Sequence, residues 1–210
     1  MDLVYLDCSV NPISDLSRLA TMRLHRIDAT DCDIEDLSPL RGMPLHMALL
    51  ARNRISNIAA LSDSQLDILD LGNNPIEDLS PLQGSQLRLL QIPRTQVKDL
   101  SPLSGLALRK LYASHNQIHD LSPLQATPLV HLAINNTEVS DLSPLPTDTL
   151  KNLFATGCPI QDFGATSATP PTSFCFGDAR ISPDALSAAR DQWQAERPQL
   201  ARMANAVLAA

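Results

Sequence analysis

The feature that most constrains this chain is a five-residue string, Asp-Leu-Ser-Pro-Leu, that recurs at a constant spacing. Exact copies stand at 36–40, 78–82, 99–103, 120–124 and 141–145. Degenerate copies begin at Asp15, Asn57 and Asp162, so every step from 15 to 162 is 21 residues (99 − 78 = 21). A fixed period without insertions predicts stacked structural units, each of which contacts mainly its two neighbours.

Each unit contains a strand pattern followed by a turn pattern. In the copy at 66–86, Leu69 and Leu71 flank Asp70, and this alternation predicts a short strand with one face inward. Parallel stacking at ~4.8 Å then joins strands that are too short to be stable alone. In the return segment Leu79 and Leu82 lie three residues apart, which suits one tight 3₁₀ or α turn with Ser as N-cap and Pro as the first helical residue.

Two polar columns accompany this pattern. The ninth position of the unit carries asparagine in four copies, and we expect its amide to bond backbone groups of adjacent coils. These residues are Asn11, Asn53, Asn74 and Asn116, with Cys32, Thr95, Thr137 and Cys158 at the same position elsewhere. The aspartate that opens each return segment forms the second column. We expect it to accept local backbone N–H bonds, and the alternative is a row of cation sites, which would require several converging oxygens.

The unit, written L-x-x-L-x-L-x-x-N-x-I-x-D-L-S-P-L, resembles that of bacterial leucine-rich repeat proteins. It is most similar to the short-repeat class that includes internalins and the phosphatase-regulatory leucine-rich proteins, and the resemblance covers about 1–181. It implies an α/β solenoid, a right-handed horseshoe with a parallel β-sheet on the concave face and short 3₁₀ turns on the convex face. It also implies binding of partners and leaves their identity open.

The two ends of the chain differ in pattern. We expect one solenoid domain at 1–181 with eight to nine repeats, followed by a helical C-terminal cap at 182–210. The cap is predicted because Ser182, Pro183 and Asp184 form a helix start, and Trp193 lies on one stripe with Leu186. A repeat strand begins at once near Leu3, so we also expect an uncapped sheet edge that allows self-association or continues a longer protein.

Composition and motif content exclude several classes of function. Lys and Arg number 16 against 23 Asp and Glu, and this acidic balance argues against a nucleic-acid partner. No apolar run reaches the ~18 residues of a membrane span, and no leader pattern opens the chain, so we expect a cytoplasmic protein without a membrane partner. The sequence carries no recognised nucleophile, metal or phosphate-loop motif. We therefore expect no catalytic residues, no metal and no cofactor.

The outward positions of successive strands define the candidate binding surface. Met47, Leu49, Ile68 and Leu89 fall side by side on a face that should be solvated, and contiguous exposed apolar surface suggests an interaction site. Acidic residues precede basic ones along this face, which would orient a partner. The predicted partner-binding residues are Met47, Leu49, Ile68, Asp70, Leu89, Gln91, Arg94, Arg109, Lys110, Tyr112, His131 and Phe154.

Three functions remain open at this point. The first is a non-catalytic interaction module that binds a protein or peptide on the concave face. The second is a targeting or regulatory segment of a larger bacterial signalling enzyme, because similar leucine-rich tracts are joined to kinase domains. The third is a secreted, host-directed effector, by analogy to internalins. The resemblance favours the first of these, and the function lies in the site rather than in the fold.

Overall fold

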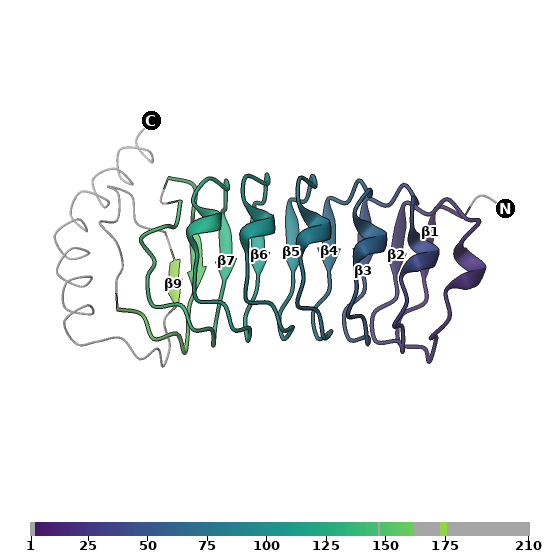
Figure 1. Cartoon of the computed structure of the whole chain (residues 1–210), viewed down its shortest axis with the longest axis horizontal. Helices are drawn as coiled ribbons and strands as arrows, with labels where there is room; N and C mark the ends of the chain where they lie inside the picture. The colour runs from purple at the N-terminus through teal and green to yellow at the C-terminus, as the bar shows by residue number, and fades with distance from the viewer. Residues whose placement is uncertain (1–2, 147, 162–172, 176–210) are drawn as a thin grey trace, which may run out of the picture.

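The computed structural model describes residues 3–146, 148–161 and 173–175, the last three as backbone only. Within these residues the chain winds into an elongated solenoid, with its strands in one row and its 3₁₀ helices in a second row against them (Figure 1). The strands form one sheet in the order in which they occur along the chain, and each pair is parallel. The predicted leucine-rich repeat solenoid is thereby confirmed.

The strands are three residues long and follow one another every 21 residues for most of the chain. Their bounds are β1 (Tyr5–Asp7), β2 (Arg26–Asp28), β3 (Met47–Leu49), β4 (Ile68–Asp70), β5 (Leu89–Gln91), β6 (Lys110–Tyr112), β7 (His131–Ala133), β8 (Asn152–Phe154) and β9 (Ser173–Cys175). The partner of each strand residue is its equivalent on the next coil, for example Leu69 opposite Leu90. The solenoid therefore keeps the register of the sequence repeat from β1 to β9.

The return segments form six 3₁₀ helices in the described part of the chain. These are η1 (Ser17–Leu19), η2 (Ser38–Leu40), η3 (Ala59–Leu61), η4 (Ser80–Leu82), η5 (Ser101–Leu103) and η6 (Ser122–Leu124). The copy at 141–145 is assigned as a turn instead. Its Leu145 N–H still donates to Leu142, but the next residue is Pro146, which has no N–H for the second bond of a 3₁₀ helix.

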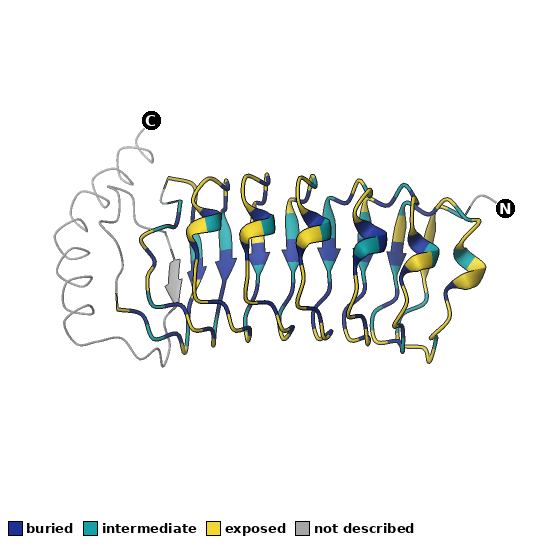
Figure 2. Ribbon diagram, in the orientation of Figure 1, coloured by how far each residue is buried: buried dark blue, intermediate teal, exposed yellow. Residues whose placement is uncertain are grey.

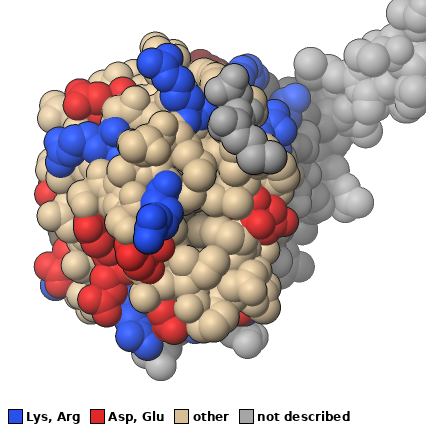
Figure 3. Space-filling view, turned by 90° about the vertical axis from the view of Figure 1, so that its right-hand side faces the viewer, with Lys and Arg blue, Asp and Glu red and all other residues tan. Residues whose placement is uncertain are grey.

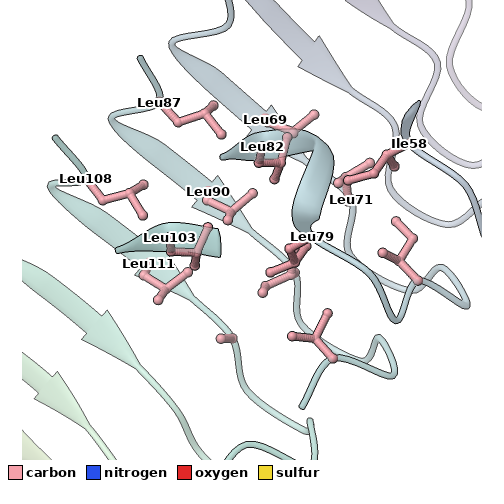
Figure 4. Packing of buried hydrophobic residues seen from close by; sticks show 14 of the residues in the cluster. Ile58, Leu69, Leu71, Leu79, Leu82, Leu87, Leu90, Leu103, Leu108 and Leu111 are labelled. Atoms are coloured by element: carbon pink, nitrogen blue, oxygen red, sulfur yellow. The ribbon is translucent and has the colours of Figure 1, made fainter. Parts of the chain in front are cut away.

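The core lies between the strands and the 3₁₀ helices. Ile58, Leu79 and Leu82 come from the return segments, and Leu69 and Leu90 come from the strands that face them (Figure 4). All five are almost fully buried. The buried positions follow the inward columns of the repeat, whereas the exposed positions lie mostly on the 3₁₀ helices and the connecting segments (Figure 2). Leucine therefore provides the core of every described coil, as the pattern predicts.

Asparagine at the ninth position links neighbouring coils through backbone groups. The Asn53 amide donates to the carbonyl of Ala29 on the preceding coil at 2.8 Å and to Leu50 on its own coil at 3.0 Å, and its oxygen accepts the N–H of Ile34. Cys158 makes a weaker version, with Sγ 3.0 Å from the carbonyl oxygen of Ile134 on the preceding coil. The predicted role of this column in bonding adjacent coils is confirmed.

A column of left-handed backbone conformations, which the repeat pattern did not reveal, follows the strands. Its members are Val10, Asp31, Arg52, Asn73, Arg94, His115 and Asn136, with φ between 54° and 61°, and Gly157 at 76°. The N–H of each non-glycine member donates to the next coil, as Val10 does to Thr30 at 2.8 Å. Only some members are residue types that tolerate this conformation, so their identities did not point to it.

Aspartate, not serine, caps the return turn. Asp78 accepts the backbone N–H of Ser80 at 2.7 Å and its hydroxyl at 2.7 Å, while the residue at the N-cap position, Leu79, has no side-chain bond. Ser80 is the first residue of η4, so the prediction of serine as N-cap was wrong. These bonds from Ser80 lower the pKa of Asp78 below its usual 3.8. Equivalent bonds occur at Asp15, Asp36, Asp99, Asp120 and Asp141.

We expect Asp78→Ala to lower the free energy of unfolding at pH 7 by about 1 kcal/mol, the usual value of a turn cap. A carboxyl whose pKa is lowered by folding contributes its stability above its usual pKa and loses it as the pH falls further. The difference between wild type and variant should therefore shrink below about pH 4, as measured by urea unfolding across pH.

Asp78→Asn is the matched control for this prediction. Asn57 holds the equivalent position of another coil and accepts the N–H of Ala59 at 2.8 Å, so asparagine preserves the backbone bond. The asparagine variant should lose less stability at pH 7 than the alanine variant. Equal losses in the two variants would show that the backbone bond is not what stabilises the turn.

A candidate binding surface on the strand face

Two columns of outward side chains form the candidate binding surface on the concave face of the sheet. Strand pairing places Met47, Ile68, Leu89, Lys110 and His131 in one column. It places Leu49, Asp70, Gln91 and Tyr112 in the other, followed by Ala133 and then Phe154. Ten of the twelve predicted residues therefore lie on the strands and in register.

The other two predicted residues flank the strands on opposite sides. Arg109 directly precedes β6, and its carbonyl accepts the N–H groups of Val130 and His131 on the next coil. Arg94 lies in the left-handed column after β5, with φ of 55°. Both side chains are exposed. These two arginines thus flank the strand columns on opposite sides, and the other ten predicted residues lie within the columns.

The apolar part of the surface is less exposed than the alternation predicts. Met47, Leu49, Ile68 and Leu89 are all half-buried, because each is flanked by its equivalents on the adjacent coils. Among the described residues, the large apolar side chains that are most exposed are Val4, Tyr5, Val10 and Phe154. Of these, only Phe154 was among the predicted partner-binding residues, although alternation alone would place Tyr5 on the same face.

Ion pairs between coils mix the charges along the surface. Arg88 binds both carboxylate oxygens of Asp67 on the preceding coil, with 2.9 Å between Nη2 and Oδ2, and its hydrogen bond lowers the pKa of Asp67. Arg52 lies 3.9 Å from Asp31 at the other margin. Figure 3, which looks at the β1 end, also shows acidic and basic side chains side by side. The simple division into an acidic and a basic half is therefore too coarse.

Asp70 is the unusual residue of this surface. Asp70 is half-buried between Leu49 and Gln91, and its carboxylate accepts one hydrogen bond, from the N–H of Gly72 at 2.9 Å. Burial raises the pKa of Asp70, the charge of Asp28 raises it further, and the bond from Gly72 opposes both. Asp70 has no ion pair with any described residue. A desolvated carboxylate thus faces outward beside apolar side chains.

The far end of the surface is polar and hydrogen-bonded. Asn152 and His131 on adjacent strands are joined by a bond of 2.7 Å between the amide nitrogen and Nδ1. Asn135 and Ser114, in the loops after the strands, form another such pair at 3.3 Å. These contacts fix side chains across β6 to β8. A fixed polar region beside the apolar one suits recognition more than chemistry, because no activated nucleophile is among them.

The described residues contain neither a cluster of three or more His, Cys, Asp or Glu side chains with metal-binding geometry nor a helix with the length and apolar character of a membrane span. A hollow of about 300 Å³ lies beside Val10 and Cys32, and none of its lining residues belongs to the two strand columns. The predicted C-terminal cap at 182–210 lies outside the described residues. The strand surface is the candidate site that the structure supports.

Comparison with known proteins agrees with this geometry. Residues 106–147 match the sequence profile of the family described as Leucine Rich repeats (2 copies). Together with the register and core described above, this match shows that the chain has a leucine-rich repeat fold. No curated protein sequence matches it.

Solved structures with the same fold include two internalins and a third bacterial repeat protein. An internalin F from Listeria monocytogenes has a TM-score of 0.65 and 23% identity over 86% of this chain and 62% of its own. An internalin C2 from the same organism has a TM-score of 0.54 and 29% identity over 74% of this chain and 80% of the internalin C2 chain. A leucine-rich repeat protein from Leptospira interrogans has a TM-score of 0.62 and 17% identity over 89% of this chain and 57% of the Leptospira chain. This chain thus spans less than two thirds of the length of the internalin F and of the Leptospira protein.

Proposed function

We propose that this chain is a non-catalytic module that binds a protein or peptide on the strand face of its solenoid. The observation that carries the proposal is the register of the two outward columns, which turns residues 21 positions apart into neighbours on one surface. Leucine-rich repeat folds serve generally as protein-interaction modules. The repeated geometry provides a rigid, extended surface, on which affinity depends on the side chains that it presents.

Apolar and aromatic side chains supply the anchors of the proposed surface. Leu49 and Tyr112 lie in one column, separated by Asp70 and Gln91, and Phe154 is exposed further along it. Aromatic residues with half-buried rings are frequent hot spots of interfaces because they bury a large area with few rotatable bonds. Arg94, Arg109 and Lys110 border this region and would orient the partner.

Replacing Leu49 and Tyr112 together by alanine should abolish capture of the partner and leave the fold intact. Both side chains are half-buried and point away from the core, so the variant should unfold within about 1 kcal/mol of wild type. The measurement is quantitative affinity capture from the native cell with mass spectrometry, in parallel with circular dichroism of the purified variant.

A double variant on the opposite surface is the control for this experiment. Gln83 and Gln125 are exposed directly after η4 and η6, so Gln83→Ala with Gln125→Ala removes side chains of similar size from the convex face. A specific partner should be retained by wild type and by this control and lost from the strand-face variant. A partner retained equally by all three proteins would place its binding elsewhere and overturn the proposal.

A further inference from the structure

The charges that remain unpaired on the strand face specify the chemistry of the occupant. In the described part of the chain, Asp67 and Arg88 bind each other, whereas Asp70 and Lys110 take part in no ion pair. Asp70 is half-buried next to Leu49 and Ile68, and Lys110 is exposed on β6. They are the two charged residues of β3 to β6, so this part of the surface presents an anionic point, an apolar stretch and a cationic point.

From this complementarity we propose that the strand face binds an extended peptide segment in which a Lys or Arg side chain reaches Asp70 and an Asp or Glu side chain reaches Lys110. This rests on the proposed function and names the chemistry of its partner. The segment between the two charges is apolar, and it covers Leu89 and Ile68, which lie beside each other on adjacent strands.

The spacing of the two charges sets the spacing in the peptide. Asp70 and Lys110 are on strands two steps apart, which is ~10 Å along the solenoid, and two residues apart along the strand direction, which is ~7 Å. Their separation is therefore about 12 Å. An extended peptide rises ~3.3 Å per residue and turns every second side chain to the same face, so its cationic and anionic residues should lie about four positions apart.

Desolvation makes Asp70 the more discriminating of the two points. Burial raises the free energy of its ionised form, which is why its pKa lies above the usual value, and its single bond from Gly72 leaves further lone pairs unused. A cation that binds there meets a carboxylate already stripped of part of its water. The charge of Asp28, in the same column two strands away, adds to the attraction for a cation and rejects an anion.

The experiment is selection from a random peptide library displayed on phage, using the full chain as bait. The three parallel baits are wild type, Asp70→Asn and Lys110→Gln. Wild type should enrich peptides with Lys or Arg about four positions from Asp or Glu, with apolar residues between them. Asp70→Asn should lose the preference for the cation alone, and Lys110→Gln the preference for the anion alone. Synthetic peptides from the wild-type pool should bind Asp70→Asn at least about tenfold more weakly, the value of a charge-assisted hydrogen bond.

A stability measurement separates recognition from folding. Asparagine at this position keeps an oxygen for the N–H of Gly72 and removes a charge that burial disfavours, so Asp70→Asn should melt at the same temperature as wild type or higher. A variant that is as stable as wild type but has lost the cation preference therefore supports the assignment. A melting temperature that falls together with the affinity would overturn it in favour of a structural role.

The same selection distinguishes a failure of the proposed function from a failure of the proposed charge pattern. If the enriched peptides bind the Leu49→Ala, Tyr112→Ala variant, Asp70→Asn and Lys110→Gln all as well as wild type, the strand face is not the binding surface and the proposed function fails. If they require Leu49 and Tyr112 but show no charge pattern that changes in Asp70→Asn, the module binds its partner on this face and only the present inference is wrong.

Discussion

Asn74→Leu should destabilise the solenoid by about 3–4 kcal/mol, although leucine is the residue that fills the rest of the core. The Asn74 amide donates to the carbonyl of Leu50 at 2.9 Å and to that of Leu71 at 3.0 Å, and its oxygen accepts the N–H of Ile55 at 3.0 Å. The side chain is almost fully buried. Leucine would leave these backbone groups without partners where water does not reach them, at about 1–3 kcal/mol each.

The structure itself shows how much of this cost can be relieved. Where the next coil carries Thr95 instead of asparagine, the N–H of Ile76 turns to the carbonyl of Asn74 on its own coil at 2.9 Å. The N–H of Ile55 can make the same adjustment in Asn74→Leu. The carbonyls of Leu50 and Leu71 have no such alternative. The predicted loss of unfolding free energy is therefore about 3 kcal/mol, which is less than the summed cost of all three unsatisfied groups.

Asn74→Thr tests this explanation with a residue that the repeat already uses. Thr95 and Thr137 donate to the carbonyl of their own coil, at 3.0 Å and 2.8 Å, and neither bonds a backbone carbonyl of the coil before. Threonine should therefore cost about half as much as leucine at position 74, measured as the free energy of unfolding in urea. If the two variants lose the same stability, the bond within the coil contributes nothing.

Sequence periodicity could predict the fold because each coil repeats the same set of local interactions. The inward leucines, the asparagine amide and the turn leucines occur at fixed offsets, and one register satisfies them in the coils whose side chains are described. The same register correctly placed Leu49, Asp70 and Gln91 as neighbours on one surface. That surface follows from geometry alone, whatever side chains occupy it.

Other properties depend on the neighbouring coil and could not be predicted from a single unit. Met47 and Ile68 are shielded by each other, so alternation overestimated their exposure. The pair between Asp67 and Arg88 was available in principle, because opposite charges 21 residues apart must meet in this register. The residue type at Val10 did not predict its left-handed backbone conformation, which is unfavourable for a β-branched residue. Val10 adopts it because its N–H then donates to the next coil.

The function is less determined than the fold for the same physical reason. The repeat fixes where outward side chains lie but leaves their identity free, so the strand face differs from coil to coil while the core does not. Asp70 shows this most clearly: its position is dictated by the register, whereas its burial and its lack of an ionic partner depend on Leu49, Gln91 and Arg88. We expect recognition to occur at residues like Asp70, whose position is fixed by the strand register and whose charge has no ionic partner.

Leu90→Ala should cost about 3–4 kcal/mol, a loss comparable with that of Asn74→Leu but with a different cause. Leu90 lies between Leu69 and Leu111 on the adjacent strands and is completely buried (Figure 4). Alanine removes the contacts to both neighbouring coils and leaves a cavity that the fixed backbone register cannot close. In a solenoid these contacts are the coupling between coils, so the variant should also unfold over a broader range of urea.

Leu6→Ala is the same chemical change on β1, where the described sheet has a neighbour on one side only. Leu6 pairs with Ile27 and is half-buried, so its truncation removes fewer contacts and should cost about half as much. Urea unfolding followed by circular dichroism measures both variants. Because the two substitutions delete the same atoms, their difference isolates the coupling to the second neighbour. Equal losses of unfolding free energy at Leu6 and Leu90 would mean that stability comes from contacts within each coil. That result would contradict a contribution of neighbouring coils to the stability of the core.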